Sequence, residues 1–160
     1  MKLVVHAVGR LKAGPERELA ERYFDRLEKS GPAVGLEFSG VAEIAESRAQ
    51  TAPARRREEG QRLQAQIQPG TALVLLDERG SNLSSDEFAG RIGLLRDGGR
   101  KAAIVAIGGP DGHDASLRGQ ADLVLSFGAL TWPHQLVRVM LAEQLYRVAT
   151  ILSGHPYHRA

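Results

Sequence analysis

The stretch Ile104–Trp132, IVAIGGPDGHDASLRGQADLVLSFGALTW, determines what fold to expect. Two short apolar runs, Ala102–Ile107 and Leu123–Leu125, lie in it or overlap it, and runs this short and apolar are typical of strands buried on both faces. Each run leads into a loop of small residues, Gly108–Gly112 and Ser126–Thr131. Ligands bind beyond the carboxyl ends of strands in open α/β sheets. The two loops therefore predict one ligand site.

The rest of the chain alternates in the same way between apolar runs and helical patterns. The predicted strands are Leu3–Val8, Val34–Phe38 (the weaker candidate), Thr71–Leu76, Ala102–Ile107 and Asp122–Leu125. Predicted helices begin at Pro15, Ala54, Ser85 and Pro133, and the last reaches about Leu152. We expect a mobile loop from Val41 to the second helix and another loop at Ser81–Ser85. This order predicts a single α/β domain over residues 1–160, with a parallel sheet flanked by helices.

The composition narrows the class of protein. The 160 residues are 42% hydrophobic and 25% charged, which is ordinary for a globular domain. The chain has no cysteine, which excludes disulfides and thiolate metal sites. No apolar stretch approaches the roughly 18 residues of a membrane span, and the N-terminus does not have the pattern of a signal peptide. We expect a cytoplasmic protein without a membrane partner. The net charge of +2 is compatible with an RNA partner but too small to indicate one.

The last predicted helix has an unusually wide apolar face. Five residues form one stripe at helical spacing: Val137, Leu141, Leu145, Val148 and Leu152. Other apolar residues widen the stripe beyond what one sheet face needs, which predicts a homodimer. Arg138 lies inside this arc, where a guanidinium must be paired or face an anion. Glu143 and Arg147 lie on the polar side and are predicted to form a surface pair.

The two glycine-containing loops each have two interpretations. Gly108–Gly112 matches neither the dinucleotide-binding nor the P-loop motif, so a tight turn and a ligand loop are about equally supported. Ser126–Trp132 is unusually apolar for a loop, which suggests that it is buried. Its backbone groups would then need partners, either from a ligand with an adenine-like edge or from a subunit interface. We favour the ligand.

Several polar residues could serve chemistry or only structure. His134 is either a helix-start residue or catalytic, and the tail His155–Arg159 is either frayed or a surface for single-stranded RNA. His6 is expected in the core and His113 in solvent. Arg55–Arg57 is expected to be a solvated face that at best adds phosphate contacts. The two tail histidines lack a third ligand, so we expect no metal.

Three segments together resemble one known family: IGGPDG (Ile107–Gly112), LSFGALTWPHQLVRVMLAEQLYR (Leu125–Arg147) and HPYHR (His155–Arg159). They resemble the RlmH family, the bacterial ribosomal large-subunit RNA methyltransferases of the SPOUT superfamily. The opening KLVVHAVGRLK and the pair Leu76-Asp77 are also similar. The resemblance implies an α/β fold with a C-terminal deep trefoil knot and a homodimer. It also implies transfer of a methyl group from S-adenosylmethionine to N3 of pseudouridine 1915 of 23S rRNA in the assembled ribosome.

The resemblance also implies roles for individual residues. Cofactor contacts are expected at Leu76, Gly108, Gly109, Phe127, Gly128, Ala129, Leu130, Thr131 and Trp132. Candidates for substrate positioning and catalysis are His134, Arg138, Tyr157, His158 and Arg159, with the general base unassigned. Two other functions stay open. One is a SPOUT methyltransferase acting on tRNA, and the other is a non-catalytic α/β module that binds a nucleotide or RNA.

Overall fold

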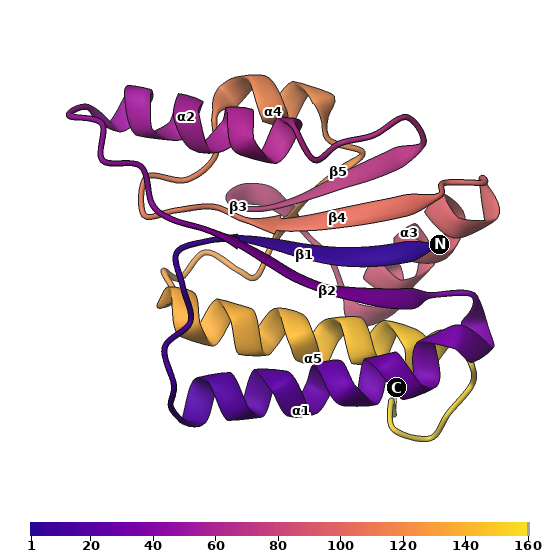
Figure 1. Ribbon diagram of the computed structural model, residues 1–160. Coiled ribbons are helices and arrows are strands. Elements are labelled where there is room, and N and C mark those ends of the chain that lie inside the picture. The colour runs from indigo at the N-terminus through magenta and orange to yellow at the C-terminus, as the bar shows by residue number, and fades with distance from the viewer. Residues whose placement is uncertain (160) are drawn as a thin grey trace.

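The computed structural model describes residues 1–159 and contains one five-stranded parallel sheet (Figure 1). The strands are β1 (Lys2–Val8), β2 (Glu37–Ile44), β3 (Thr71–Asn82), β4 (Ala102–Ile107) and β5 (Leu123–Ser126), in the spatial order β2-β1-β4-β3-β5. The helices are α1 (Pro15–Ser30), α2 (Ala52–Gln64), α3 (Ser85–Asp97), α4 (Ala115–Gln120) and α5 (His134–Leu152), with a short 3-10 helix at Gly31–Val34. The predicted α/β class with a parallel sheet is confirmed.

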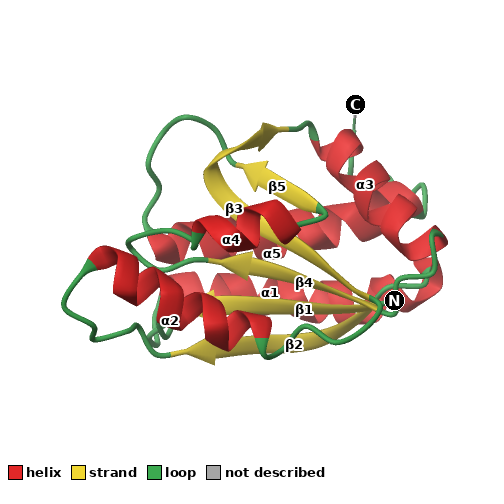
Figure 2. Cartoon of the chain, turned by 90° about the horizontal axis from the view of Figure 1, so that it is seen from above, coloured by secondary structure: helices red, strands yellow, loops and turns green. Residues whose placement is uncertain are grey.

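The helices cover both faces of the sheet. Helices α2 and α4 lie on one face, and α1 and α5 pack side by side on the other (Figures 1 and 2). Side chains that alternate along β3 therefore enter different cores. Ala72 and Val74 belong to the core shared with α1, α3 and α5, whereas Leu73 and Leu75 belong to the core under α2 and α4. This double burial explains why the central strands are continuous apolar runs.

Strand β3 continues beyond the predicted end at Leu76. Its pairing with β5 shifts register between Leu76 and Ser81 and then resumes to Asn82. A Cβ at Gly80 would lie 2.6 Å from the backbone carbon of Leu125, so glycine allows the two backbones to approach. The predicted loop at Ser81–Ser85 is therefore wrong for its first two residues.

The edge strand β2 and the N-terminus of α2 also differ from the expectation. Strand β2 starts at Glu37, and its alternating burial pattern is that of a strand at the edge of a sheet. Helix α2 starts at Ala52, where the Thr51 hydroxyl accepts a hydrogen bond from the Ala54 amide at 3.3 Å. The weak apolar content of both segments hid these boundaries.

The segment between β2 and α2 is not the predicted mobile loop. The Ser47 amide donates to the Glu59 carboxylate at 2.8 Å, and Arg62 donates to the Ala45 carbonyl at 2.9 Å. Both partners lie on α2, so the helix fastens the segment that precedes it. That prediction is wrong because the bonds that order the segment come from residues further along the chain.

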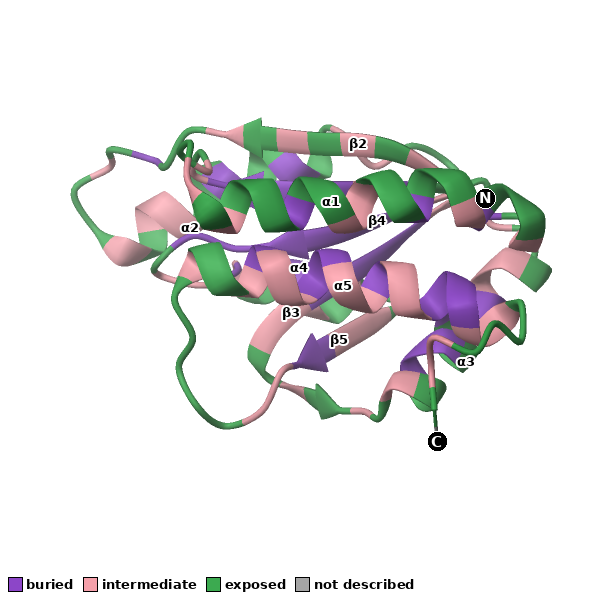
Figure 3. Ribbon diagram, turned by 90° about the horizontal axis from the view of Figure 1, so that it is seen from below, coloured by how far each residue is buried: buried purple, intermediate pink, exposed green. Residues whose placement is uncertain are grey.

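Helix α5 packs against α1 and α3 as well as the sheet. Leu141, Leu145 and Val148 are fully buried within one protomer, and Figure 3 shows buried and intermediate residues along most of the helix. Part of the wide apolar arc is thus covered by neighbouring helices. Leu136 at the start of the helix is 41% exposed.

The predicted trefoil knot stays a prediction from the resemblance. Along the described part of the chain, no helix combines the length and apolarity needed to cross a bilayer.

Candidate functional site

Residues 76–79 of β3 and the loops that follow β4 and β5 meet at the carboxyl edge of the sheet and enclose a cavity of about 270 Å³. We call it the strand-end cavity. Its lining comprises residues 76–79, 107–112 and 125–132 without Ala129, together with Arg118, His134 and Val137. All of the predicted cofactor residues except Ala129 line it, and Ala129 is exposed. The parallel topology explains this convergence, because parallel strands place their carboxyl ends at the same edge.

The loop 126–132 stabilises its own backbone. The Ser126 hydroxyl lies 3.1 Å from the Gly128 carbonyl and accepts from the Gly128 amide at 3.2 Å. Gly128 has φ +105°, a conformation that favours glycine. The Trp132 indole donates to the Phe127 carbonyl at 3.2 Å. The prediction that this apolar loop is buried fails at its tip, where Leu130 is 72% exposed in the protomer.

The loop 108–112 is a tight turn that also lines the cavity. The Gly112 amide donates to the Gly109 carbonyl at 2.9 Å, and Gly112 has φ +78°. Gly108 and Gly109 are buried, and a Cβ on either would meet other side chains. At Gly108 it would lie 3.2 Å from the His113 ring, and at Gly109 it would lie 2.8 Å from a Glu59 carboxylate oxygen. A side chain at either glycine would therefore require His113 or Glu59 to shift, whatever ligand binds.

Five charged residues in the lining of the cavity were not predicted from the sequence: Asp77, Glu78, Arg79, Asp111 and Arg118. Two of them, Asp77 and Arg118, form an ion pair. Asp77 follows the buried run of β3, and its side chain is 7% exposed. Its carboxylate lies 3.3 Å from Nε of Arg118, which comes from α4. Asp77 carried a usable signal, since it is an acidic residue directly after a buried strand at the ligand edge of the sheet. Nothing in the sequence around Arg118 indicated a role in the site, because only the fold brings α4 to this edge.

His113 is buried rather than solvent-facing, which corrects the prediction. It is 6% exposed and lies beneath Gly108. Burial lowers the pKa of His113, while the nearby Asp77 carboxylate acts in the opposite direction. His6 is a core histidine as predicted, and its Nδ1 lies 3.2 Å from the Gln66 side-chain oxygen. Burial lowers the pKa of His6 as well.

These two histidines predict a pH dependence of stability. Both pKa values are lowered in the folded protein, so below about pH 6.5 the unfolded chain binds more protons than the folded one. The free energy of unfolding should fall between pH 7.5 and 5.5, by at most about 1.4 kcal/mol per histidine for each pH unit. Urea unfolding across this range measures it.

Matched variants assign the effect. His113→Gln should flatten the dependence, whereas His155→Gln, which changes an exposed tail histidine, should not. The carboxylates of Glu43 and Asp111 have lowered pKa values, and their protonation reduces the free energy of unfolding only below about pH 4. Two titratable side chains act on His113. His6 contributes to the lowering of the His113 pKa, and the Asp77 carboxylate opposes it. Equal stability at both pH values would contradict the prediction.

The catalytic candidates lie in different places. His134 lines the strand-end cavity. Arg138, one turn further along α5, is 6% exposed and donates to the Glu43 carboxylate and the Gly9 carbonyl. The prediction that this guanidinium must be paired is confirmed. Arg138 lines a separate cavity of about 290 Å³ beside α1, β1 and β2.

The C-terminal tail packs on the far end of α5. The Tyr157 hydroxyl donates to the Glu143 carboxylate at 3.1 Å, and burial raises the pKa of Tyr157. The Arg147 guanidinium lies 4.9 Å from the centre of the Tyr157 ring and donates to His158 Nδ1 at 3.1 Å. The predicted pair Glu143–Arg147 exists and serves as the platform for the tail. Arg159 is exposed.

The tail and the strand-end cavity are therefore separated within one protomer. His134 and Arg147 are 13 positions apart on α5, which corresponds to about 20 Å along a helix. The structure brings the predicted cofactor residues together with His134, and it does not bring Tyr157, His158 or Arg159 to them.

A parallel sheet covered on both faces, with glycine-containing loops enclosing a cavity at its carboxyl edge, defines an α/β domain that binds a small molecule. Residues 1–158 match the family described as "Predicted SPOUT methyltransferase". The chain belongs to this family, and the resemblance found in its loops and tail is confirmed.

Curated relatives are similar over their whole length. The chain is 78% identical to the ribosomal RNA large subunit methyltransferase H of Mesorhizobium japonicum, and the alignment covers all of both chains. It is 64% identical to the protein of the same name from Brucella anthropi, again over all of both chains. Among solved structures, the SpoU methyltransferase AviRb from Streptomyces viridochromogenes aligns with 92% of this chain and 59% of its own, at 11% identity and a TM-score of 0.39.

Proposed function

We propose that this protein transfers a methyl group from S-adenosylmethionine to large-subunit ribosomal RNA, at N3 of pseudouridine 1915 of 23S rRNA in the assembled ribosome. The observation that carries the proposal is the convergence of two loops and residues 76–79 of β3, all present in the matched family segment, on one cavity. The names of the full-length relatives support RNA of the large subunit as the substrate class. A ribosomal substrate would place the protein in the cytoplasm.

The residues of the strand-end cavity fit S-adenosylmethionine. Glycine-rich backbone in two loops offers amide and carbonyl groups to an adenine edge, and Leu76 and Trp132 offer apolar surface. Asp77 and Glu78 place carboxylates in the lining and Arg79 places a guanidinium there. The ammonium and sulfonium groups of S-adenosylmethionine would have carboxylates available in the lining, and its carboxylate would have a guanidinium. When bound, the cofactor supplies an electrophilic methyl group.

The chain's own residues would position the substrate nitrogen. N3 of the uracil ring is an imide nitrogen that carries a proton at neutral pH, and this proton must leave as the N–CH₃ bond forms. His134 lines the cavity and can contact the base, and a neutral imidazole can accept a proton. A cation near the uracil carbonyls would stabilise the developing negative charge. Arg138 is already paired with Glu43, so Arg159 and the tail histidines are better placed to serve a mobile substrate.

We infer that a homodimer completes the site. In one protomer the cavity lies at the start of α5 and the tail packs on its second half, from Glu143 onward. A two-fold axis across this helix would bring one protomer's tail to its partner's cavity. Leu19 and Leu136 are exposed on this side, next to a cavity of about 410 Å³ that Val139 and Met140 line. Light scattering should give about twice 17.3 kDa. A stable monomer would overturn the inference.

The proposed function is tested with labelled S-adenosylmethionine and ribosomes from a strain that lacks the modification. Label should enter 23S rRNA at one pseudouridine. Label in tRNA instead would indicate another SPOUT activity. Tight cofactor binding without transfer to either RNA would favour a non-catalytic binding module.

A further inference from the structure

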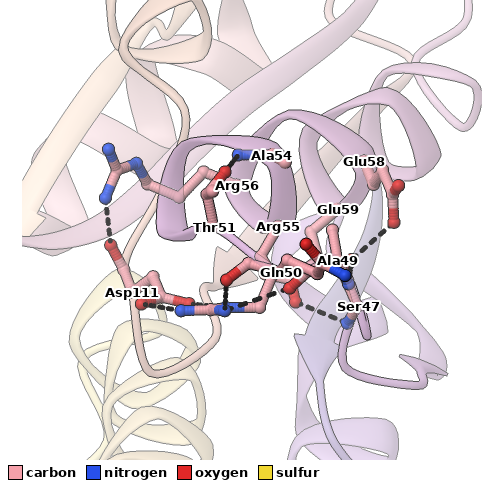
Figure 4. Close-up of polar contacts among 10 residues, drawn as sticks. All are labelled: Ser47, Ala49, Gln50, Thr51, Ala54, Arg55, Arg56, Glu58, Glu59 and Asp111. Atoms are coloured by element: carbon pink, nitrogen blue, oxygen red, sulfur yellow. Dashed lines mark hydrogen bonds and ion pairs between the residues drawn. The ribbon is translucent and has the colours of Figure 1, made fainter.

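Asp111, in the loop that lines the strand-end cavity, is held by the first turn of α2. Arg55 donates from Nε to one carboxylate oxygen of Asp111 at 2.6 Å and from Nη2 to the other at 3.1 Å (Figure 4). Arg56 donates to the Asp111 carbonyl at 3.4 Å. Such a two-point guanidinium–carboxylate pair fixes both distance and orientation. The loop is thus attached to a helix 56 positions earlier in the sequence.

Arg55 is itself anchored on its other side. Its Nη1 donates to the Ala49 carbonyl at 3.1 Å, so the guanidinium bridges the segment before α2 and the cavity loop (Figure 4). The hydrogen bond from Arg55 lowers the pKa of Asp111 further below its ordinary value, so the carboxylate that Arg55 binds is fully charged at neutral pH.

A second residue of α2 contacts the same loop from beneath. Glu59 follows Arg55 by four positions and so lies on the same face of the helix. It is 5% exposed, and its carboxylate lies directly under Gly109. The other carboxylate oxygen accepts from the Ser47 amide at 2.8 Å. The oxygen of Glu59 that lies near Gly109 has no hydrogen-bond partner among the described residues. Helix α2 therefore contacts the loop at two points, and the ion pair with Asp111 is the one that holds it.

We propose that Arg55 is a positioning residue for the cofactor: through its ion pair with Asp111 it fixes the loop Gly108–Gly112 in the conformation that binds S-adenosylmethionine. This assignment rests on the proposed function. It replaces the expectation that residues 55–57 form only a solvated face. Arg57 does fit that expectation, since it is exposed and forms no ion pair within residues 1–159.

The test compares Arg55→Ala, Arg55→Lys and Asp111→Asn, with Arg57→Ala as the control that removes the same charge from the same helix. Calorimetry with S-adenosylmethionine in the absence of RNA should show a Kd raised about fivefold for Arg55→Ala and Asp111→Asn. Arg55→Lys should fall between these and the intact protein, because lysine keeps the charge but loses the two-point geometry. Arg57→Ala should bind normally.

Three further readouts separate positioning from other roles. The Arg55→Ala/Asp111→Asn double variant should bind no more weakly than either single variant, since both remove one interaction. The amide resonances of Gly108, Gly109 and Gly112 should shift in the ligand-free Arg55→Ala protein but not in Arg57→Ala. With ribosomes, KM for S-adenosylmethionine should rise about fivefold while kcat stays within about twofold.

An unchanged Kd with unchanged glycine amides would overturn the proposal. A raised KM for ribosomes alone would overturn it too, and would make Arg55 a phosphate contact. If the intact protein bound no S-adenosylmethionine, the proposed function and the cofactor role of Arg55 would both fail. In that case the glycine amides would still report whether Arg55 holds the loop, so the two failures are distinguishable.

Discussion

Deleting residues 155–160 should abolish methylation of ribosomes and leave a folded dimer that binds S-adenosylmethionine. The tail carries two histidines, a tyrosine and an arginine within five residues. Stacking on a base contributes about 1–3 kcal/mol, and a charge-assisted contact about 1.5–3 kcal/mol. Losing one of each at the transition state lowers the rate about a thousandfold.

The fold should tolerate this deletion. The described part of the tail, residues 155–159, contacts Glu143, Arg147 and Asp86, and the Tyr157 ring packs on Tyr146. No side chain of these five residues belongs to the two hydrophobic cores. Circular dichroism, light scattering and cofactor calorimetry should match the intact protein. Methylation at near the intact rate would show that the substrate site lies elsewhere, and Arg138 would be the next residue to test.

Mixed dimers decide whether the tail acts across the interface. A tail-deleted protomer paired with a protomer carrying a blocked strand-end cavity would contain one complete site if each tail serves its partner's cavity. About half of the activity per dimer should then return, although each homodimer is inactive. If each tail served its own cavity, the mixed dimer would stay inactive. The activity of the mixed dimer therefore shows whether each tail serves the cavity of its own protomer or that of its partner.

Gly108→Val should weaken S-adenosylmethionine binding by at least about tenfold, which corresponds to about 1.4 kcal/mol. A Cβ at Gly108 would lie 3.2 Å from both the His113 ring and the Gly112 carbonyl carbon. The branched side chain would have to displace His113 or shift the loop relative to the cavity. Either change alters the backbone that we expect to face the cofactor.

The matched control is Gly119→Val in α4, where a Cβ would meet nothing within 4 Å. Calorimetry on both variants, after urea unfolding has confirmed that each is folded, gives the comparison. An unchanged affinity in folded Gly108→Val would place the cofactor away from this loop.

The central strands could be predicted from sequence, and the edge strand could not be placed correctly. Ala102–Ile107 and Thr71–Leu76 are buried on both faces, so every residue in them is apolar or small and the signal is local. Strand β2 lies at the edge and alternates between intermediate and exposed residues. Its sequence EFSGVAEI contains Gly40 and two glutamates, which obscured the pattern. A strand buried on both faces is therefore easier to predict from its own residues than a strand at the edge of the sheet.

By itself, the sequence determined the parallel α/β fold, the two loops that line the strand-end cavity, and the need for a partner at Arg138. These follow from short-range patterns, since apolar runs define strands and parallel strands bring the loops after them to one edge. Only the tertiary structure decided which charges distant in sequence meet. Glu43 pairs with Arg138 from 95 positions away, Asp111 pairs with Arg55 from 56 positions away, and His113 is buried under Gly108. The physical reason is that an ion pair requires two side chains to meet, and no pattern in the neighbourhood of either residue records which distant segment the fold places beside it.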